Sequence, residues 1–202
     1  MSGYSAESLD AVSLRRVFLL ATRELFSDPV NYGDLSDKLS SFKYSEDIKE
    51  SSLLVDLDFE YNPKELQPRQ AIYVGLGDVS FDTTVLDHMA AISEDRSRVT
   101  YVQSAKTALQ VRCVAPNADE PLYLATVAAA FFFAMRPTFM DELGLSRMDL
   151  AGLSKPTLID KAPTRMFEVS FIANLAFNFN VISTLEGHRL KSYKLKTTSL
   201  TP

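Results

Sequence analysis

The sequence predicts an α+β fold: a mainly antiparallel sheet with one apolar helix packed on it, plus an N-terminal helix and extension. Residues 122–135 contain a single polar side chain, Thr126, so a helix there must be covered on all sides. Residues 167–181 alternate apolar and polar side chains, which is the period of a half-buried strand. Together the two segments indicate a helix lying across a sheet.

The composition is that of an ordinary globular protein. The chain has 202 residues, of which 46% are hydrophobic and 23% are charged, enough for one domain with a sizeable core. Its net charge of −5 argues against a protein that grips nucleic-acid phosphates. The single cysteine, Cys113, excludes an intramolecular disulfide and fits a reducing compartment.

The sequence predicts no membrane association. The apolar run at residues 121–135 is shorter than the roughly 20 residues that cross a bilayer, and Arg136 and Pro137 end it. The N-terminus has no basic stretch leading into a long apolar one, so we expect no signal peptide.

A proline-containing segment, residues 62–69, is the best candidate for a linker. It divides the chain into residues 1–68, a helix with an extended segment, and residues 69–202, an α+β core domain. Apolar side chains recur at helical spacing over residues 5–26, which predicts the first helix. A short helix is expected at residues 35–39.

An acidic strand is predicted at residues 53–61, where apolar side chains alternate with carboxylates. Asp56, Asp58 and Glu60 would line its exposed face. A metal site is not expected, because the segment lacks the glycine of a calcium-binding loop. The carboxylates then form either a solvated acidic face or an acidic face turned toward a partner or a channel.

The pattern of the next region is typical of short strands. Residues 71–76 and 79–81 have strand character interrupted by glycines, and residues 84–92 fit a short helix or an excursion. Residues 98–103 and 106–114 are predicted to form the two strands of a hairpin.

The central helix is expected to continue over residues 138–143 after a kink at proline, and Gly144 is a natural stop. Residues 147–163 then form a long connection, which either contacts a partner or is a plain surface loop. Residues 188–196 are predicted to form a last strand rich in lysine and arginine, which discourages uncontrolled edge pairing.

The sequence contains no catalytic signature. Two histidines and one cysteine are too few for a zinc site built from these residues, and the GLGD sequence at residues 75–78 lacks the spacing of a phosphate-binding loop. We therefore predict a protein that is not an enzyme and that has no cofactor, metal or catalytic site.

The order of the predicted elements resembles that of the tail terminator and neck proteins of tailed bacteriophages. The matching stretches are residues 107–114, the helix 119–135 with Gly144-Leu145 after it, and the strand 167–181. In that family an α+β protomer packs a helix on a mainly antiparallel sheet and assembles into a ring, typically a hexamer. Such a ring closes the tail tube and joins it to the head.

The resemblance implies a structural protein of the virion. Its partners would be further copies of the chain in a ring, the tail tube, and the neck or connector proteins, while DNA passes through without specific binding. The N-terminal 68 residues are longer than the family pattern. Asp56, Asp58 and Glu60 would face the lumen, where carboxylates repel DNA phosphates.

Contacts between subunits are predicted on the second face of the central helix, in residues 147–163 and at the ends of the long strand. The candidate interface residues are Phe131, Phe132, Phe133, Leu150, Leu153, Phe177 and Phe179. An alternative stays open, because carboxylates that pair in space are invisible in a sequence: a cytosolic α+β enzyme or small-ligand-binding module with its pocket beneath the central helix.

Overall fold

The computed structural model describes residues 11–28, 30–32, 39, 41–47, 49–81, 89–92, 98–186 and 189–196. Within them the chain forms helices and one mixed, mostly antiparallel sheet, which confirms the predicted α+β class. Residues 5–10 of the predicted first helix, most of the predicted helix at 35–39, and His188 lie outside this part of the chain.

The described strands form a single nine-stranded sheet, whose main order is β1-β2-β5-β8-β6. Strands β1 and β2 pair in parallel, and the remaining pairs are antiparallel. The strands are β1 (Leu53–Leu57), β2 (Gln70–Leu76), β3 (Ser80–Phe81), β4 (Met89–Ile92), β5 (Arg98–Ala115), β6 (Leu145–Leu153), β7 (Thr157–Leu158), β8 (Phe167–Glu186) and β9 (Arg189–Lys196).

Strands β5 and β8 form the spine of this sheet. They pair without a register shift from Arg98 opposite Thr184 to Ala115 opposite Phe167. Strands β2, β3 and β4 follow one another along the outer side of β5, and β7, β6 and β9 follow one another along the outer side of β8. Every other strand except β1 therefore takes its position from this pair.

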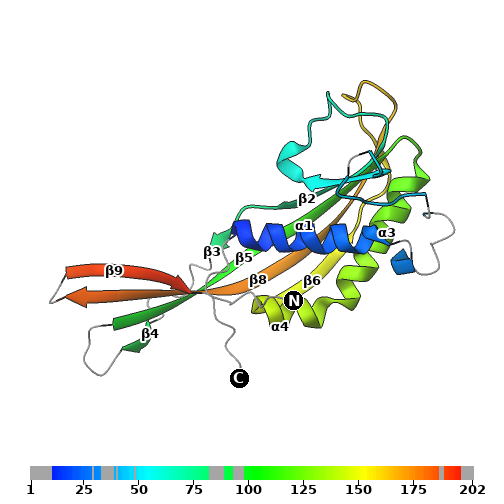
Figure 1. Ribbon diagram of the computed structural model, residues 1–202. Helices are drawn as coiled ribbons and strands as arrows, with labels where there is room; N and C mark the ends of the chain where they lie inside the picture. Colours follow the sequence, from blue (N-terminus) through cyan, green and yellow to red (C-terminus); the bar gives the residue numbers. More distant parts are fainter. Residues whose placement is uncertain are drawn as a thin grey trace.

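The spine extends beyond the body of the protein as an arm, which consists of β4, residues 98–104 of β5, residues 178–186 of β8, and β9. Figure 1 shows the arm projecting past α4 and the short strand β3, with no helix covering it. At about 3.3 Å per residue, the nine residues of β8 in the arm span about 30 Å.

Three helices cover one face of the body (Figure 1). Helix α1 (Ala11–Ser27) lies over β1 and β2, α3 (Asp119–Ala134) lies over β5 and β8, and α4 (Arg136–Leu143) lies beside β6. Among the described residues no single helix is long and apolar enough to cross a membrane; α3 and α4 pass that test only as a pair, which is bent by 58°.

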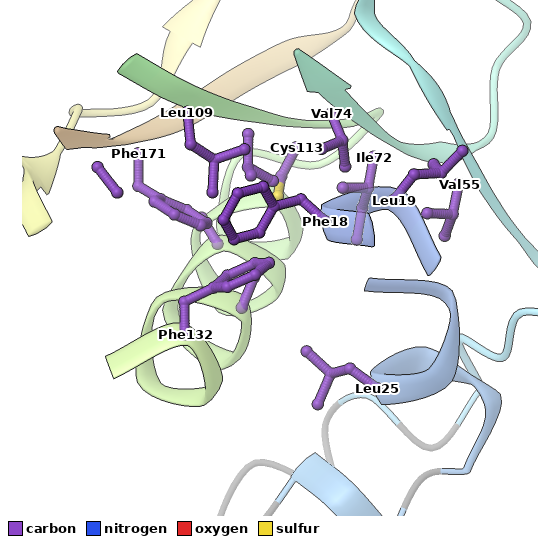
Figure 2. Close-up of a cluster of buried hydrophobic side chains, with 14 of the residues drawn as sticks. Phe18, Leu19, Leu25, Val55, Ile72, Val74, Leu109, Cys113, Phe132 and Phe171 are labelled. Carbon is purple, nitrogen blue, oxygen red and sulfur yellow. The ribbon is translucent and has the colours of Figure 1, made fainter. Parts of the chain in front are cut away.

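The core lies between the helices and the sheet, and Phe18 of α1 is at its centre (Figure 2). The ring of Phe18 lies 5.7 Å from that of Phe132 on α3, in an edge-on arrangement. Phe132 lies 5.7 Å from Phe171 of β8, so aromatic contacts connect both helices to the sheet. All three side chains are buried, as is Cys113 beneath them.

One core joins the two regions that the sequence divided at residue 68. Leu14, Phe18, Leu53 and Val55 belong to the same buried cluster as Leu109 and the other core residues of the sheet. The N-terminal helix and β1 are thus part of the body, packed against β2 and its neighbours.

Helix α3 is apolar on both faces, but only one of them is buried. Leu124, Ala128 and Phe132 point into the core, whereas Phe133 is 66% exposed. The predicted bend after α3 is present, and Gly144, with φ of 60°, ends α4 as predicted.

Four local predictions were wrong. Residues 98–103 and 106–114 belong to one strand, β5, because the unbroken partner β8 pairs with every residue between them. For residues 84–92, predicted as a short helix or an excursion, the helix alternative is wrong at 89–92, which form a strand because they pair with the arm portion of β5. Most of the predicted connection 147–163 is β6 and β7.

The fourth error concerns the acidic strand, which ends at Leu57. Residues Asp58–Glu60 form a 3-10 turn, so the alternation at 53–61 does not continue along one strand. The carboxylates of Asp56, Asp58 and Glu60 therefore do not share one strand face.

We expect Phe132→Ala to lower the free energy of unfolding by about 3–5 kcal/mol, because it removes a fully buried ring from the centre of the core. Phe133→Ala, one residue along the same helix, should change it by no more than about 0.5 kcal/mol. Urea unfolding of the protomer measures both. Equal losses would contradict the burial difference between the two rings.

Alkaline pH should destabilise the protein through Tyr32, whose hydroxyl donates its proton to the carbonyl of Phe42, with the carbonyl of Phe26 also within hydrogen-bond distance. Burial, reinforced by the charge of Asp28, raises the pKa of Tyr32 from 10.0 to about 12. The neutral phenol is thus favoured in the folded state, and its contribution, complete below pH 10, is lost as pH rises toward 12. Urea unfolding across that range should show a shallower pH slope for Tyr32→Phe, even though this variant starts from a lower stability.

Candidate assembly surface

The two edges of the sheet in the body differ in whether their backbone groups are satisfied. At the β1 edge, the alternate residues Leu53, Val55 and Leu57 face outward, and the backbone of each makes at least one hydrogen bond. The carbonyl of Val55 accepts bonds of 3.1 and 3.0 Å from the Arg23 guanidinium, and the carbonyl of Leu53 accepts one of 2.6 Å from Ser51 Oγ. The N–H of Leu53 donates to the Lys43 carbonyl, and that of Leu57 donates to Asp56 Oδ1. Of the outward groups of Leu53 and Val55, only the Val55 N–H has no partner among the described residues, so the β1 edge is largely closed to further pairing.

The β6 edge is open. The Ser154 N–H donates to the Ser170 carbonyl at 2.8 Å, so Ser170 and the alternate residues after it on β8 direct their backbone groups toward β6. Their partners on β6 face back toward β8, whereas Met148 and Leu150 direct theirs away from it; Met148 is only 1% exposed and Leu150 is half-buried, so Leu150 offers the accessible backbone groups. No backbone group elsewhere in the described chain bonds to them.

Exposed apolar side chains gather along this open edge. Of the nine large hydrophobic residues exposed in the described chain, four lie on β6 or next to it: Phe133, Leu153, Leu158 and Ile172. We call these four residues, together with β6, the β6 edge surface. Such clustering on one edge marks an interaction site better than scattered exposed residues do.

Gly152 contributes to this surface by lacking a side chain. It pairs with Ile172 at a register shift in β6, and its φ of 143° is one that other residues rarely adopt. A Cβ added there would meet no atom within 4 Å, so the space beside Ile172 is open.

A small cavity of about 160 Å³ lies where α3 and α4 meet β6. It is lined by Phe132, Phe133, Arg136, Met148, Asp149 and Leu150. Asp149 pairs with Arg136 at 3.2 Å and also with Arg147 on its own strand. Its carboxylate is thus held between two guanidinium groups, which neutralises it and ties α4 to β6.

The structure brings three of the predicted interface residues together on this surface: Phe133, Leu150 and Leu153. The prediction was wrong for Phe132 and Phe177, which are buried inside the protomer. Phe131 is half-buried against the ring of Phe132. The side chain of Phe179 lies outside the described part of the chain, although its backbone belongs to β8 in the arm.

The sequence prediction missed Ile172 and Leu158. Ile172 carried a usable signal, because it is an apolar residue in the polar register of the alternating segment 167–181, between Ser170 and Asn174. Leu158 carried none, since its exposure depends on the position of β7 along β8.

Two of the three predicted lumen carboxylates are paired with arginines. Asp58 Oδ1 accepts a bond of 2.9 Å from Arg112 Nε, and Asp56 Oδ1 lies 3.8 Å from Arg23 Nη2. Glu60 is exposed on the 3-10 turn. The negative charge of this region is therefore partly compensated.

Arg112 is the centre of a polar network on the sheet face opposite the helices. Besides Asp58, it contacts Glu168 at 3.1 Å and Gln110 at 3.3 Å, and its guanidinium lies 5.3 Å from the Tyr61 ring centroid. The Tyr61 hydroxyl donates to Glu168 at 2.8 Å, and burial together with this carboxylate raises the pKa of Tyr61. The network fixes residues 58–61 against β5 and β8.

No group of three or more potential metal ligands occurs among the described residues. Cys113 is fully buried, and burial raises the pKa of its thiol, so the nucleophilic thiolate is disfavoured. A wider groove of about 430 Å³ at the base of the arm is lined by the charged residues Asp78, Lys106 and Arg147, by Asn174 and Leu175, and by small residues.

Comparisons with known proteins add no family assignment. No protein-family model matches the chain, and a search of curated proteins found no match.

The close approach of Asp58 to the sheet depends on Gly75. A Cβ at Gly75 would lie 2.6 Å from the Asp58 Cβ, whereas a Cβ at Gly77 would lie no closer than 3.6 Å to any neighbour. We expect Gly75→Ala to displace Asp58 from Arg112 and to destabilise the protein by about 1–3 kcal/mol. Gly77→Ala should change stability by less than about 1 kcal/mol. Chemical unfolding tests the pair, and equal effects would refute a role for the close approach.

Proposed function

We propose that the protein is a ring-forming structural component of the tail or neck of a tailed bacteriophage, which closes the tail tube and joins it to the head. The observation that carries this proposal is the difference between the two edges of the body. The chain provides hydrogen-bond partners for the outward N–H and carbonyl of Leu53 and for the carbonyl of Val55 at the β1 edge, yet no described strand pairs with the outer side of β6.

Open edges with apolar neighbours invite association, and proteins usually protect them. A chain that closes one edge and leaves the other open is suited to controlled assembly. Repeated contacts between two different surfaces of identical subunits close into a ring when the rotation between neighbours allows it.

The resemblance to tail terminator and neck proteins supports the same conclusion from the sequence. Helix α3 packed on the antiparallel pair β5 and β8 has the arrangement that the resemblance implied. In this proposal the partners are other copies of the chain, the tail tube and the connector, and DNA passes without specific binding. The net charge of −5, more than any single acidic patch, would keep DNA phosphates from adhering.

The alternative, a ligand pocket beneath the central helix, has no supporting observation in the described residues. The space under α3 is filled by Leu124, Ala128 and Phe132 against Leu109 and Phe171. The small cavity at the end of α3 contains an arginine and a carboxylate that neutralise each other.

We expect the purified protein to form closed rings, visible by negative-stain electron microscopy and counted by native mass spectrometry. Leu153→Asp should shift it toward monomers, because a carboxylate would be buried in the contact. Leu20→Asp is the matched control, since Leu20 on α1 is also 44% exposed but lies far from β6 along the sheet. A protein that stays monomeric at micromolar concentration, alone and with tail-tube protein, would refute the proposal.

A further inference from the structure

The arm offers the second surface that a ring contact needs, and we propose that strand β9 of one copy pairs with the β6 edge of the next copy. The two sheets would thereby join into one continuous sheet across each subunit boundary. This inference rests on the proposed ring assembly and names the contact that forms it.

Strand β9 is the edge that matches β6 in length. It has eight residues and pairs with β8 on one side, while no described strand pairs with its other side. Strand β6 has nine residues. The other outer strands fit less well, because β4 has only four residues and the β1 edge is largely closed.

The sheet twists where the body meets the arm, and this twist separates the two open edges. Figure 1 shows β6 on the lower side of the body and β9 on the upper side of the arm, although both flank β8. The edges therefore face opposite sides of the molecule. A β9-to-β6 contact uses two different surfaces, so it repeats from copy to copy in one direction.

Charge favours the same pairing. Arg189, Lys191, Lys194 and Lys196 make four of the eight residues of β9 basic, in a chain whose net charge is −5. Beside the β6 edge, Asp141 and Glu142 of α4 are exposed, and neither has an ion-pair partner among the described residues. Charges placed in this way steer association and select the register of a contact.

The β6 edge limits how much of β9 it can accept. Register shifts interrupt β6 between Leu145 and Arg147 and between Leu150 and Gly152. In the regular stretch between them Met148 is buried, so the accessible outward groups are those of Leu150, with Leu153 and Phe133 beside it. Backbone hydrogen bonds would supply the contact, and the flanking apolar side chains would exclude water from it.

Hydrogen–deuterium exchange on the full chain tests the pairing. We compare the assembled protein with the same protein diluted until native mass spectrometry shows monomers. Amides of β6 and β9 should exchange more slowly in the assembled state, while those of the closed edge β1 should exchange equally in both. Assembly without slower exchange in both β6 and β9 overturns this inference and leaves the proposed function standing. Failure to assemble under any condition overturns both.

A charge exchange identifies β9 as the strand. Lys191→Glu with Lys194→Glu should weaken assembly by about tenfold or more, and adding Asp141→Lys with Glu142→Lys should restore it. Lys43→Glu with Lys64→Glu is the control, because it alters net charge equally at two exposed lysines of the body. Equal weakening by the control pair, or no restoration by the exchange, would overturn the assignment of β9.

Discussion

The continuous antiparallel pairing of β5 with β8 is the constraint on which the rest of the structure depends. Eighteen consecutive pairs hold these strands in one register. A slip by one residue would turn Val169, Phe171, Ala173, Leu175 and Phe177 away from the helices and expose the core. The same register positions β6 and β9 along β8, and β2 and β4 along β5. Both the core and the arm are therefore consequences of one strand pair.

The helices use only one face of this sheet, and the two faces are held by different interactions. On the helix face, aromatic rings from α1, α3 and β8 pack in edge-on and tilted contacts and fill the core. On the other face, Arg112 forms ion pairs with Asp58 of the 3-10 turn and with Glu168 of β8, and Gly75 leaves room for Asp58. The Arg112 network positions residues 58–61 on that face.

Periodicity in the sequence predicted the α+β class, the central helix and the long strand, because each is a sustained local pattern. It failed where partners distant in sequence decide the outcome. The sequence predicts a hairpin over residues 98–114 because Ser104 and Ala105 interrupt the strand pattern. In the structure β8 pairs with these two residues as well, so the strand continues. Residues 147–153 show no clear alternation of apolar and polar side chains. They form a strand because they pair with β8 and because the Arg136–Asp149 ion pair ties them to α4. At the surface, apolar character was enough to select Phe133 and Leu153 as interface candidates. It selected Phe132 and Phe177 as well, and only the packing of the folded chain shows that these two are buried.

The open β6 edge is informative because the same chain closes its other body edge. Water can reach the outward groups of half-buried Leu150, whereas Met148 is only 1% exposed. The liability of an unpaired strand edge is uncontrolled pairing. The chain limits that liability with two register shifts and with the paired charges of Arg147 and Asp149 on the strand itself. At β1, by contrast, Arg23 and Ser51 bond to the outward carbonyls and so prevent pairing there; β6 has no such side chains among the described residues. The β6 edge is thus restricted in length yet not closed. It has apolar residues beside it, and a basic strand lies on the opposite side of the twisted sheet. These are the properties of a contact that admits one defined partner.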